Sequence, residues 1–232
     1  NALNQIAERD ADARMRRTRA RPLPAGRLAV PEALTFAAGL SLSGLLVLVV
    51  WVNPLTAALA AATLASYVLV YTPLKRVTTL NTLVGAVPGA LPVVGGWTAA
   101  GGDLSPAAGA LFWILFLWQL PHFLALAWLY RDDYRAGGFR MLGATADESA
   151  EAGRVVVLYA LALLPVSLLP TLFGVTGRWY FAAALLLGLG YAACGALQAL
   201  RPATAHARRL FLASVLYLPL LLFFMVVDKV AA

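Results

Sequence analysis

The sequence has very little charge and only one cysteine. Asp, Glu, Lys and Arg make up 12% of the 232 residues, whereas 61% are hydrophobic. The mean hydropathy of +0.78 is too high for a soluble domain of this length. The one cysteine, Cys194, excludes an internal disulfide, and we interpret it as a small packing residue within an apolar run.

Charge is absent from long continuous stretches. No Asp, Glu, Lys or Arg occurs in 33–74, 77–102, 104–130, 155–177, 179–200 and 210–227. Crossing a bilayer takes about 20 mostly apolar residues, so the first stretch allows two crossings, separated at Trp51-Val52-Asn53-Pro54. We therefore predict an all-α, polytopic transmembrane helix bundle. Its seven expected helices are 34–52, 55–72, 82–100, 107–130, 154–174, 179–199 and 209–227.

The basic residues predict the orientation of this bundle. Sixteen of the 18 Lys and Arg lie in or at the edges of alternate loops, namely 1–32, 73–81, 131–154 and 200–209. The positive-inside rule places these loops in the cytoplasm. The net charge of +7 is then a topology signal, so we expect the lipid bilayer and no nucleic acid as a partner. The Ala, Leu, Gly and Arg bias favours a bacterial plasma (inner) membrane over a mitochondrial one.

The first polar segment has a pattern that topology alone does not require. Asn4, Glu8 and Asp12 recur every four residues, so on an α-helix they share one face, while Asp10 points elsewhere. One amide and two carboxylates suit Mg²⁺, which takes oxygen ligands and keeps positions open for substrate phosphates. A solvated helix end, with its acids paired to nearby arginines, explains the spacing equally well.

The arginines that follow favour the metal interpretation. Arg17 and Arg21 are four residues apart and share a face, and Pro22 ends the helix. Guanidinium groups bind phosphate oxygens in bidentate fashion. Carboxylates for a metal followed by guanidinium groups predict a diphosphate site.

The second polar segment joins two expected membrane helices. Tyr71 ends one span, Lys75 and Arg76 lie in the turn, and Asn81 and Gly85 begin the next helix. Taken alone, this segment is more typical of a cytoplasmic turn followed by a helix whose glycines allow close packing.

The third polar segment lies partly inside a span. Gln119 and His122 interrupt an apolar helix, where ionisable groups are costly and usually functional. A packed, hydrogen-bonded histidine is an equally good interpretation of His122. Asp132 and Asp133 are adjacent and diverge by about 100° on a helix. We expect only one of them to face the same cavity as Asp12, as a second and weaker metal site.

Three motifs together resemble a known family. They are N-x-x-x-E-x-x-x-D-x-x-M-x-R-T-x-x-R-P (Asn4 to Pro22), Y-T-P-L-K-R-x-T-x-x-N-x-x-x-G (Tyr71 to Gly85) and W-Q-x-P-H-F-x-x-L-A-x-x-Y-x-x-D-Y-x-x-x-G (Trp118 to Gly138). In this order they resemble the UbiA superfamily of intramembrane prenyltransferases. Members typically have nine transmembrane helices. The resemblance therefore implies one membrane-embedded prenyltransferase domain over 1–232, with helices upstream of Asn1 absent.

The resemblance also implies roles for individual residues. Asn4, Glu8 and Asp12 match the acidic motif that holds the cofactor Mg²⁺ on a prenyl diphosphate, and Lys75 joins them as a catalytic residue. The diphosphate-binding residues it implies are Arg17, Arg21, Lys75, Arg76, Tyr71 and Asn81. The second acidic region is Tyr130, Asp133 and Tyr134, with Asp133 as a further metal ligand; His122 and Gln119 would contact the acceptor.

The third motif is most similar to that of members whose acceptor is haem b. The implied reaction moves a farnesyl group from farnesyl diphosphate to a vinyl group of haem b, with addition of water, and haem A synthase is the expected partner for the product. An aromatic or quinone-precursor acceptor is the main alternative, and a membrane transporter is a distant one. Two positions depart from the family pattern: Glu8 stands where many members have Asp, and Leu129 stands where they have the first Asp of a second pair.

Overall fold

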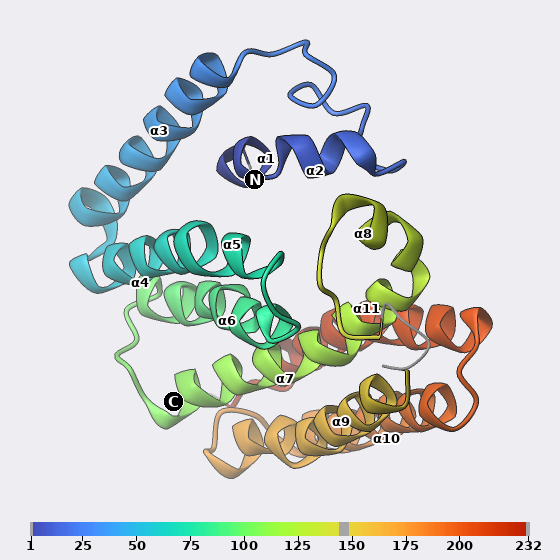
Figure 1. The fold of residues 1–232 in the computed structure, drawn as a ribbon. Helices are drawn as coiled ribbons and strands as arrows, with labels where there is room; N and C mark the ends of the chain where they lie inside the picture. Colours follow the sequence, from blue (N-terminus) through green and yellow to red (C-terminus); the bar gives the residue numbers. More distant parts are fainter. Residues whose placement is uncertain (1, 144–148, 231–232) are drawn as a thin grey trace.

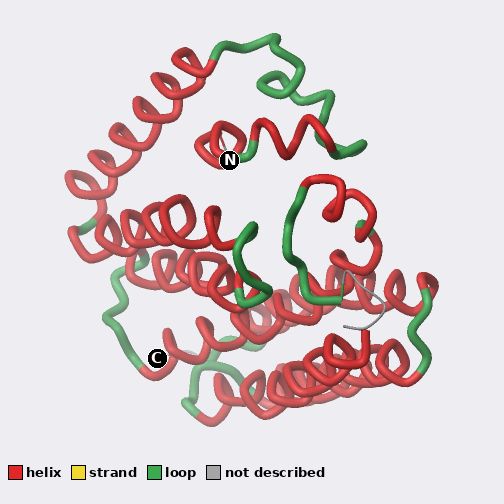
Figure 2. Tube along the Cα trace, viewed as in Figure 1, coloured by secondary structure: helices red, strands yellow, loops and turns green. Residues whose placement is uncertain are grey.

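The computed structural model describes residues 2–143 and 149–230. Figure 1 shows a helical bundle, and Figure 2 shows that the segments between helices are loops and turns. Within the described residues, the one pairing of extended backbone is an isolated bridge between Thr176 and Lys229. The helical class predicted from the charge-free stretches is therefore confirmed.

The membrane-spanning elements follow the apolar stretches. Seven described helices, or continuous runs of two or three helical elements, are long and apolar enough to cross a membrane. They are α3 (Val30–Val47) with η1 (Leu48–Val52), α4 (Pro54–Ala65) with η2 (Ser66–Tyr71) and α5 (Thr72–Leu74), α6 (Asn81–Ala99), α7 (Pro106–Leu129), α9 (Ser149–Leu172), α10 (Arg178–Leu200) and α11 (Thr204–Val227). Short helices α1 (Ala2–Ala7), α2 (Arg9–Arg14) and α8 (Arg131–Gly137) complete the fold.

The starts of the spans have local causes. Asn53 caps α4, because its side-chain oxygen accepts the backbone N–H of Thr56 at 2.7 Å and Pro54 occupies the first turn. The predicted break at Asn53 and Pro54 is thus confirmed. Helices α9 and α11 begin five residues earlier than predicted, at Ser149 and Thr204. Their first turns carry polar and charged side chains, which a helix tolerates where it leaves the bilayer.

Helix α7 is the central element of the packing. It contacts α6 on one side and α9 and α11 on others. Buried side chains such as Ile114, Leu163 and Leu210 form the core between these helices. Buried polar groups also join helices: Trp118 Nε1 donates to the carbonyl of Ser214 at 2.8 Å, and Tyr180 Oη donates to that of Ser167 at 2.8 Å. Such bonds and close packing stabilise helix association where lipid is as apolar as the helices.

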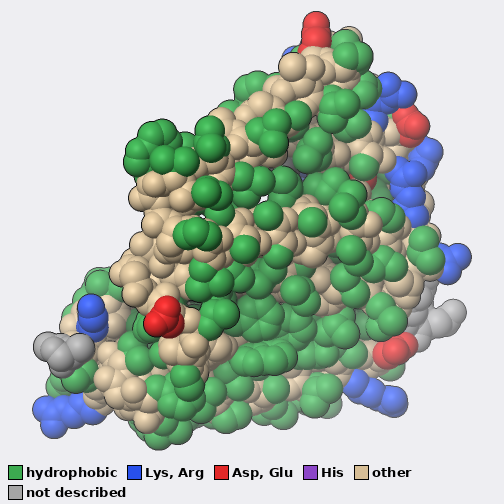
Figure 3. All heavy atoms as spheres, turned by 90° about the vertical axis from the view of Figure 1, so that its left-hand side faces the viewer, with side chains coloured by type: hydrophobic (Ala, Val, Ile, Leu, Met, Phe, Trp, Pro, Cys, Tyr) green, Lys and Arg blue, Asp and Glu red, His purple; other side chains and the backbone are tan. Residues whose placement is uncertain are grey.

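The outer surface is apolar across the face that includes α3 and α4. In Figure 3, hydrophobic side chains cover most of this face, and charged side chains lie towards its margins. Large apolar side chains such as Leu42, Leu69 and Trp51 are about 70% exposed there, at 69%, 72% and 74%. Such a surface fits contact with lipid, and with seven spans long and apolar enough to cross a bilayer the chain is a multi-pass membrane protein.

The three polar segments meet at one end of the bundle. Helices α1 and α2 lie between α3 and α8, with α1 in contact with α3 and α2 in contact with α8 (Figure 1). The Arg14 side chain donates to the carbonyls of Ala136 and Gly137 at 3.1 and 3.0 Å. The backbone N–H of Arg140 donates to the carbonyl of Lys75 at 2.8 Å. Segments far apart in the chain therefore share one polar site.

Candidate active site

The Asn4, Glu8 and Asp12 side chains lie on one buried face of the N-terminal helices. Although α1 ends at Ala7 and α2 begins at Arg9, the N–H of Glu8 donates to the carbonyl of Asn4 at 2.9 Å. The N–H of Asp12 likewise donates to the carbonyl of Glu8 at 2.8 Å, so the helical spacing continues through the break. Glu8 and Asp12 are 4% and 1% exposed, whereas the Asp10 side chain is 77% exposed. The shared face predicted from the spacing is present.

Each buried carboxylate faces a cation. Glu8 Oε1 lies 2.8 Å from Lys75 Nζ, which comes from the turn after α5. Asp12 Oδ2 accepts from Arg21 Nη1 at 2.9 Å. Asn4 Nδ2 donates to the second oxygen of Glu8 at 2.8 Å. Two acids and two cations thus balance each other in the free protein.

These groups line a cavity of about 310 Å³. Its polar wall consists of Asn4, Glu8, Asp12, Arg17, Arg21 and Lys75, and its aromatic wall includes Tyr67, Tyr71 and Tyr134. Phe123 and Leu126 of α7 close it from the membrane side. We call this space the polar cavity. It combines carboxylates, cations and an apolar floor, as a diphosphate with a lipid tail requires.

The donor set fits a hard metal ion. Lys75 Nζ is close to Glu8 Oε1, but the angle is not that of a hydrogen bond, so this buried oxygen has a charge partner and no hydrogen-bond donor. The described residues contain no cluster of three or more Asp, Glu, His or Cys that could enclose an ion. Two carboxylates and the Asn4 amide oxygen therefore suit an ion such as Mg²⁺, which takes its other ligands from water and substrate phosphates.

Aromatic rings orient the cations. Lys75 Nζ lies 4.6 Å from the centre of the Tyr71 ring, and Arg17 Cζ lies 4.9 Å from that of Tyr130. The ring faces attract these charges and keep them at the cavity wall. Burial raises the pKa of Tyr134 above its usual value, although the nearby Arg17 opposes the rise. The Tyr134 phenol is therefore neutral at physiological pH and available as a hydrogen-bond donor.

Two residues predicted to bind diphosphate lie outside the polar cavity. Arg76 donates to the carbonyl of Ala7 at 3.3 Å. Asn81 is fully buried and donates to the carbonyls of Thr78 and Arg140, both at 2.6 Å. Both side chains tie the polar segments together. Their contacts are structural, and neither lines the cavity wall.

Asp133 also lies apart from Glu8 and Asp12. Its Oδ1 accepts the backbone N–H of Arg16 at 3.1 Å. Together with Tyr130 it lines a neighbouring hollow of about 470 Å³, whereas Tyr134 lines the polar cavity. The placement gives Asp133 a role in fixing the loop after α2 and does not bring it to the other two acids.

Gln119 and His122 connect helices. Gln119 is 3% exposed, and its Nε2 donates to the carbonyls of Ala86 and Leu115, both at 3.0 Å. His122 Nδ1 is 2.7 Å from Ser214 Oγ, and its ring lies between Trp118 and Phe211. Neither lines the polar cavity; the residues of α7 that do are Phe123 and Leu126. The packed interpretation of His122 accounts for every contact that it makes here.

The structure gives contacts to three residues for which the sequence analysis named no role. Thr72 Oγ1 donates to Asn4 Oδ1 at 3.1 Å, and Thr18 Oγ1 donates to the carbonyl of Asp12 at 2.9 Å. Tyr67 lies four residues before Tyr71 and shares the cavity wall with it. That spacing on a helix was the available signal for Tyr67. Its ring lies in η2, a π-helical turn of the kind often found at functional sites.

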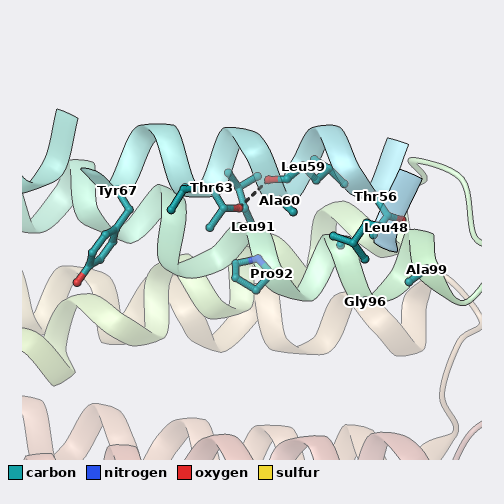
Figure 4. Close-up of a pocket in the computed structure, with 12 residues that line it drawn as sticks. Leu48, Thr56, Leu59, Ala60, Thr63, Tyr67, Leu91, Pro92, Gly96 and Ala99 are labelled. Carbon is teal, nitrogen blue, oxygen red and sulfur yellow. Dashed lines mark hydrogen bonds between the residues drawn. The ribbon is translucent and has the colours of Figure 1, made fainter. Parts of the chain in front are cut away.

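An apolar hollow of about 620 Å³ adjoins the polar cavity between α4 and α6. Figure 4 shows Thr56, Leu59 and Thr63 along α4 and Tyr67 in η2, with Leu91, Pro92, Gly96 and Ala99 along α6. Tyr67 lines both spaces, so the hollow begins beside the carboxylates and continues along the membrane-spanning helices. A polar head and a long apolar tail of one ligand can occupy the two spaces together.

Comparisons with known proteins agree with this arrangement. Residues 1–226 match the model of the UbiA prenyltransferase family. A protoheme IX farnesyltransferase of Solibacter usitatus is 47% identical over 98% of this chain and 78% of its own length. One from an Anaeromyxobacter species is 49% identical over 95% and 74%.

A solved structure of digeranylgeranylglyceryl phosphate synthase shares the fold. It superimposes with a TM-score of 0.77 at 20% identity, over 98% of this chain and 79% of that one. The likeness in fold supports the helical architecture independently of the sequence match. On the family match and the identities to its relatives, the chain belongs to the UbiA prenyltransferase family.

Proposed function

We propose that the protein transfers the farnesyl group of farnesyl diphosphate to a vinyl group of haem b, giving haem O and diphosphate. Relatives that are 47% and 49% identical are named protoheme IX farnesyltransferase. The observation that carries the proposal is the buried pairing of Glu8 with Lys75 and Asp12 with Arg21, beside an apolar hollow. Such a site binds a diphosphate head and a prenyl tail.

The acids and cations exchange partners when substrate binds. In the free protein, Lys75 and Arg21 neutralise Glu8 and Asp12. Mg²⁺ held by Glu8 and Asp12, with the Asn4 amide oxygen, would supply a Lewis acid for the diphosphate oxygens. Lys75, Arg21 and Arg17 then face the diphosphate. They stabilise the negative charge that develops as it leaves.

The tail follows α4 into the membrane. From Thr56 to Tyr67 the helix rises about 16 Å at 1.5 Å per residue, which is comparable with an extended farnesyl chain. The walls of this hollow are mostly aliphatic side chains and glycine. They keep water away from the allylic carbon, because water would otherwise capture the cation.

The two substrates and water account for every bond broken and formed in this reaction. The bond between the allylic carbon and the diphosphate oxygen breaks, and the diphosphate departs with the bonding electrons. The vinyl group of haem b supplies the electron pair for the new carbon–carbon bond. Water adds to the other vinyl carbon and loses a proton, which leaves a hydroxyethylfarnesyl group.

We further propose that the polar end of the bundle faces the cytoplasm of a bacterium. This end carries most of the Lys and Arg, and the positive-inside rule favours the cytoplasmic side for them. The relatives named above come from bacteria. Haem A synthase is the proposed consumer of the product.

The test is formation of haem O by the membrane-embedded protein. Membranes containing the protein are incubated with haem b, farnesyl diphosphate and Mg²⁺, and the extracted haems are examined by mass spectrometry. We expect farnesylated haem with the wild type and none with the Glu8→Gln, Asp12→Asn variant or with a chelator. Consumption of farnesyl diphosphate with an aromatic acceptor alone would show that the family chemistry is right and the acceptor wrong.

A further inference from the structure

The hollow beside Asp133 is lined by two arginines, Arg16 and Arg19, that the proposed diphosphate site does not use. It measures about 470 Å³ and is lined by Arg16, Arg17 and Arg19 from the loop after α2. Tyr130 and Asp133, at the junction of α7 and α8, form the opposite wall. Because Arg17 also lines the polar cavity, a ligand in this hollow lies next to the diphosphate.

The arginines of this hollow differ from Arg21 and Lys75 of the polar cavity in having no acidic partner in the part of the chain that the structure describes. Arg21 and Lys75 are each paired with a buried acid. No ion pair of the Arg16, Arg17 or Arg19 side chain occurs within residues 2–143 and 149–230. The hollow therefore has three guanidinium groups that the protein leaves without an acidic partner.

The two acids of this hollow interact with groups other than the side chains of its arginines. Asp133 accepts the backbone N–H of Arg16 at 3.1 Å, and this bond fixes the loop that carries the arginines. Asp132 also lines the hollow, but its side chain is 87% exposed and lies 3.6 Å from Arg135. With three arginines against two aspartates, the lining has an excess of positive charge, and Tyr130 and Leu129 add one aromatic and one aliphatic side chain.

We propose that this hollow binds the carboxylates of the acceptor, and that Arg16 and Arg19 hold the two propionates of haem b. The inference rests on the proposed function and deepens it by assigning an anchor for the acceptor. Guanidinium groups match carboxylates in bidentate geometry. Haem b is a flat apolar ring with two carboxylates on one edge, so it fits a cationic hollow at the end of an apolar bundle. Arg17 separates this anchor from the diphosphate.

The test compares haem b with haem b dimethyl ester, in which both carboxylates are masked. Binding is followed by the Soret band with the protein in phosphatidylcholine nanodiscs, in the absence of farnesyl diphosphate. Phosphatidylcholine has no net charge, so a lipid headgroup does not replace the carboxylates. We expect the wild type to bind haem b about tenfold more tightly than the ester, as two partly exposed charge pairs would provide.

The Arg16→Gln, Arg19→Gln variant should lose this preference and bind both haems with equal, weaker affinity. Its KM for haem b should rise about tenfold, while its KM for farnesyl diphosphate stays within twofold of the wild type. Arg9→Gln is the matched control, because Arg9 is paired with Asp10 at the surface, outside both spaces. It should keep the full preference for haem b.

Three results would overturn the anchor. They are equal binding of haem b and its ester by the wild type, a preserved preference in the double variant, and an equal rise in both KM values. Binding and turnover are measured separately, so a wild type that binds haem b through its carboxylates but never farnesylates it would refute the proposed function and leave the anchor standing.

Discussion

Asp10 and Asp12 are the same residue type two positions apart, and their surroundings differ completely. Asp12 is 1% exposed and receives the Arg21 guanidinium at 2.9 Å. Asp10 lies at the surface beside Arg9. Asp12 therefore lines the polar cavity, whereas Asp10 faces water, although the two share residue type and neighbouring positions in the chain.

We therefore predict that Asp12→Asn lowers kcat for haem farnesylation by at least about 100-fold, the size typical for losing one group that stabilises a transition state. Asp10→Asn should remain within twofold of the wild type. Product formation measured over a range of Mg²⁺ concentrations checks both variants. Equal activity of the two would mean that the buried face is structural.

Lys75 and Arg76 form a second pair of neighbours with different positions. The Lys75 ammonium lies 2.8 Å from Glu8 Oε1 and over the Tyr71 ring, whereas Arg76 donates to a backbone carbonyl of α1. Only Lys75 lines the polar cavity. The sequence predicted diphosphate binding for both and a catalytic role for Lys75 as well, but it did not show the direction in which either side chain points.

Lys75→Gln should raise the KM for farnesyl diphosphate about tenfold, because a charge-assisted contact to the diphosphate is lost. Arg76→Gln should change this KM less than threefold and act mainly on stability. Steady-state kinetics at saturating haem b, together with thermal unfolding in detergent, distinguish the two. A larger kinetic effect at Arg76 would contradict the geometry.

Among the elements, α6 shows why glycine occurs in a membrane helix here. A Cβ atom on Gly85 would clash with the Tyr71 ring, and one on Gly89 would clash with the Gln119 amide. These glycines let η2 and α7 approach α6 closely. The predicted packing role of the glycines is confirmed. The partner at each position depends on the rotation of the neighbouring helix.

Gly85→Ala should displace Tyr71 from Lys75, so we expect kcat to fall about tenfold and the unfolding temperature to drop by a few degrees. Gly44→Ala in α3 is the control, since no atom lies within 4 Å of the position of its Cβ. That substitution should leave activity intact and stabilise the helix slightly. Activity and melting curves of the two variants, measured side by side, test the contact.

The whole bundle places its polar segments at one end. Arg9, Val77 and Asp132 are exposed at the end where α1, α8 and the turn after α5 meet, and Asp103 is exposed in the loop between α6 and α7, at the other end of those helices. A single bilayer orientation requires the first three to face one compartment and Asp103 the opposite one. This requirement follows from the number of spans between them.

In a Cys194→Ala background, we predict that Arg9→Cys, Val77→Cys and Asp132→Cys react with a membrane-impermeant maleimide in inverted vesicles. Asp103→Cys should react only in spheroplasts. Labelling followed by mass spectrometry reads out each position. Reaction of the first three in spheroplasts would reverse the proposed orientation, and a mixed pattern among them would contradict the bundle itself.

The spans and the buried acidic face could be predicted because each rests on a local property. An apolar stretch forms a helix in lipid because unpaired backbone groups are costly there. Asn4, Glu8 and Asp12 share a face because the α-helix has 3.6 residues per turn. Neither inference needs to know where any other part of the chain lies.

The directions in which side chains point across the bundle could be known only from the tertiary structure. The sequence grouped Asp133 with Glu8 and Asp12, but the packing of α8 turns Asp133 to the backbone of Arg16. The acceptor contact of His122 stays a prediction, but the pairing of its ring with Ser214 of α11 could be seen only in the packed bundle. Such directions depend on how helices distant in sequence rotate against one another.

By itself, the sequence determined the class of protein, its membrane spans and the residue types of its chemistry, because desolvation and helical periodicity act within a single segment. The tertiary structure alone decided that Lys75 pairs with Glu8 and Arg21 with Asp12. It also decided that the arginines beside Asp133 stay without acidic partners among the described residues. A pairing between charges depends on distances between segments, and these distances exist only once the helices have packed.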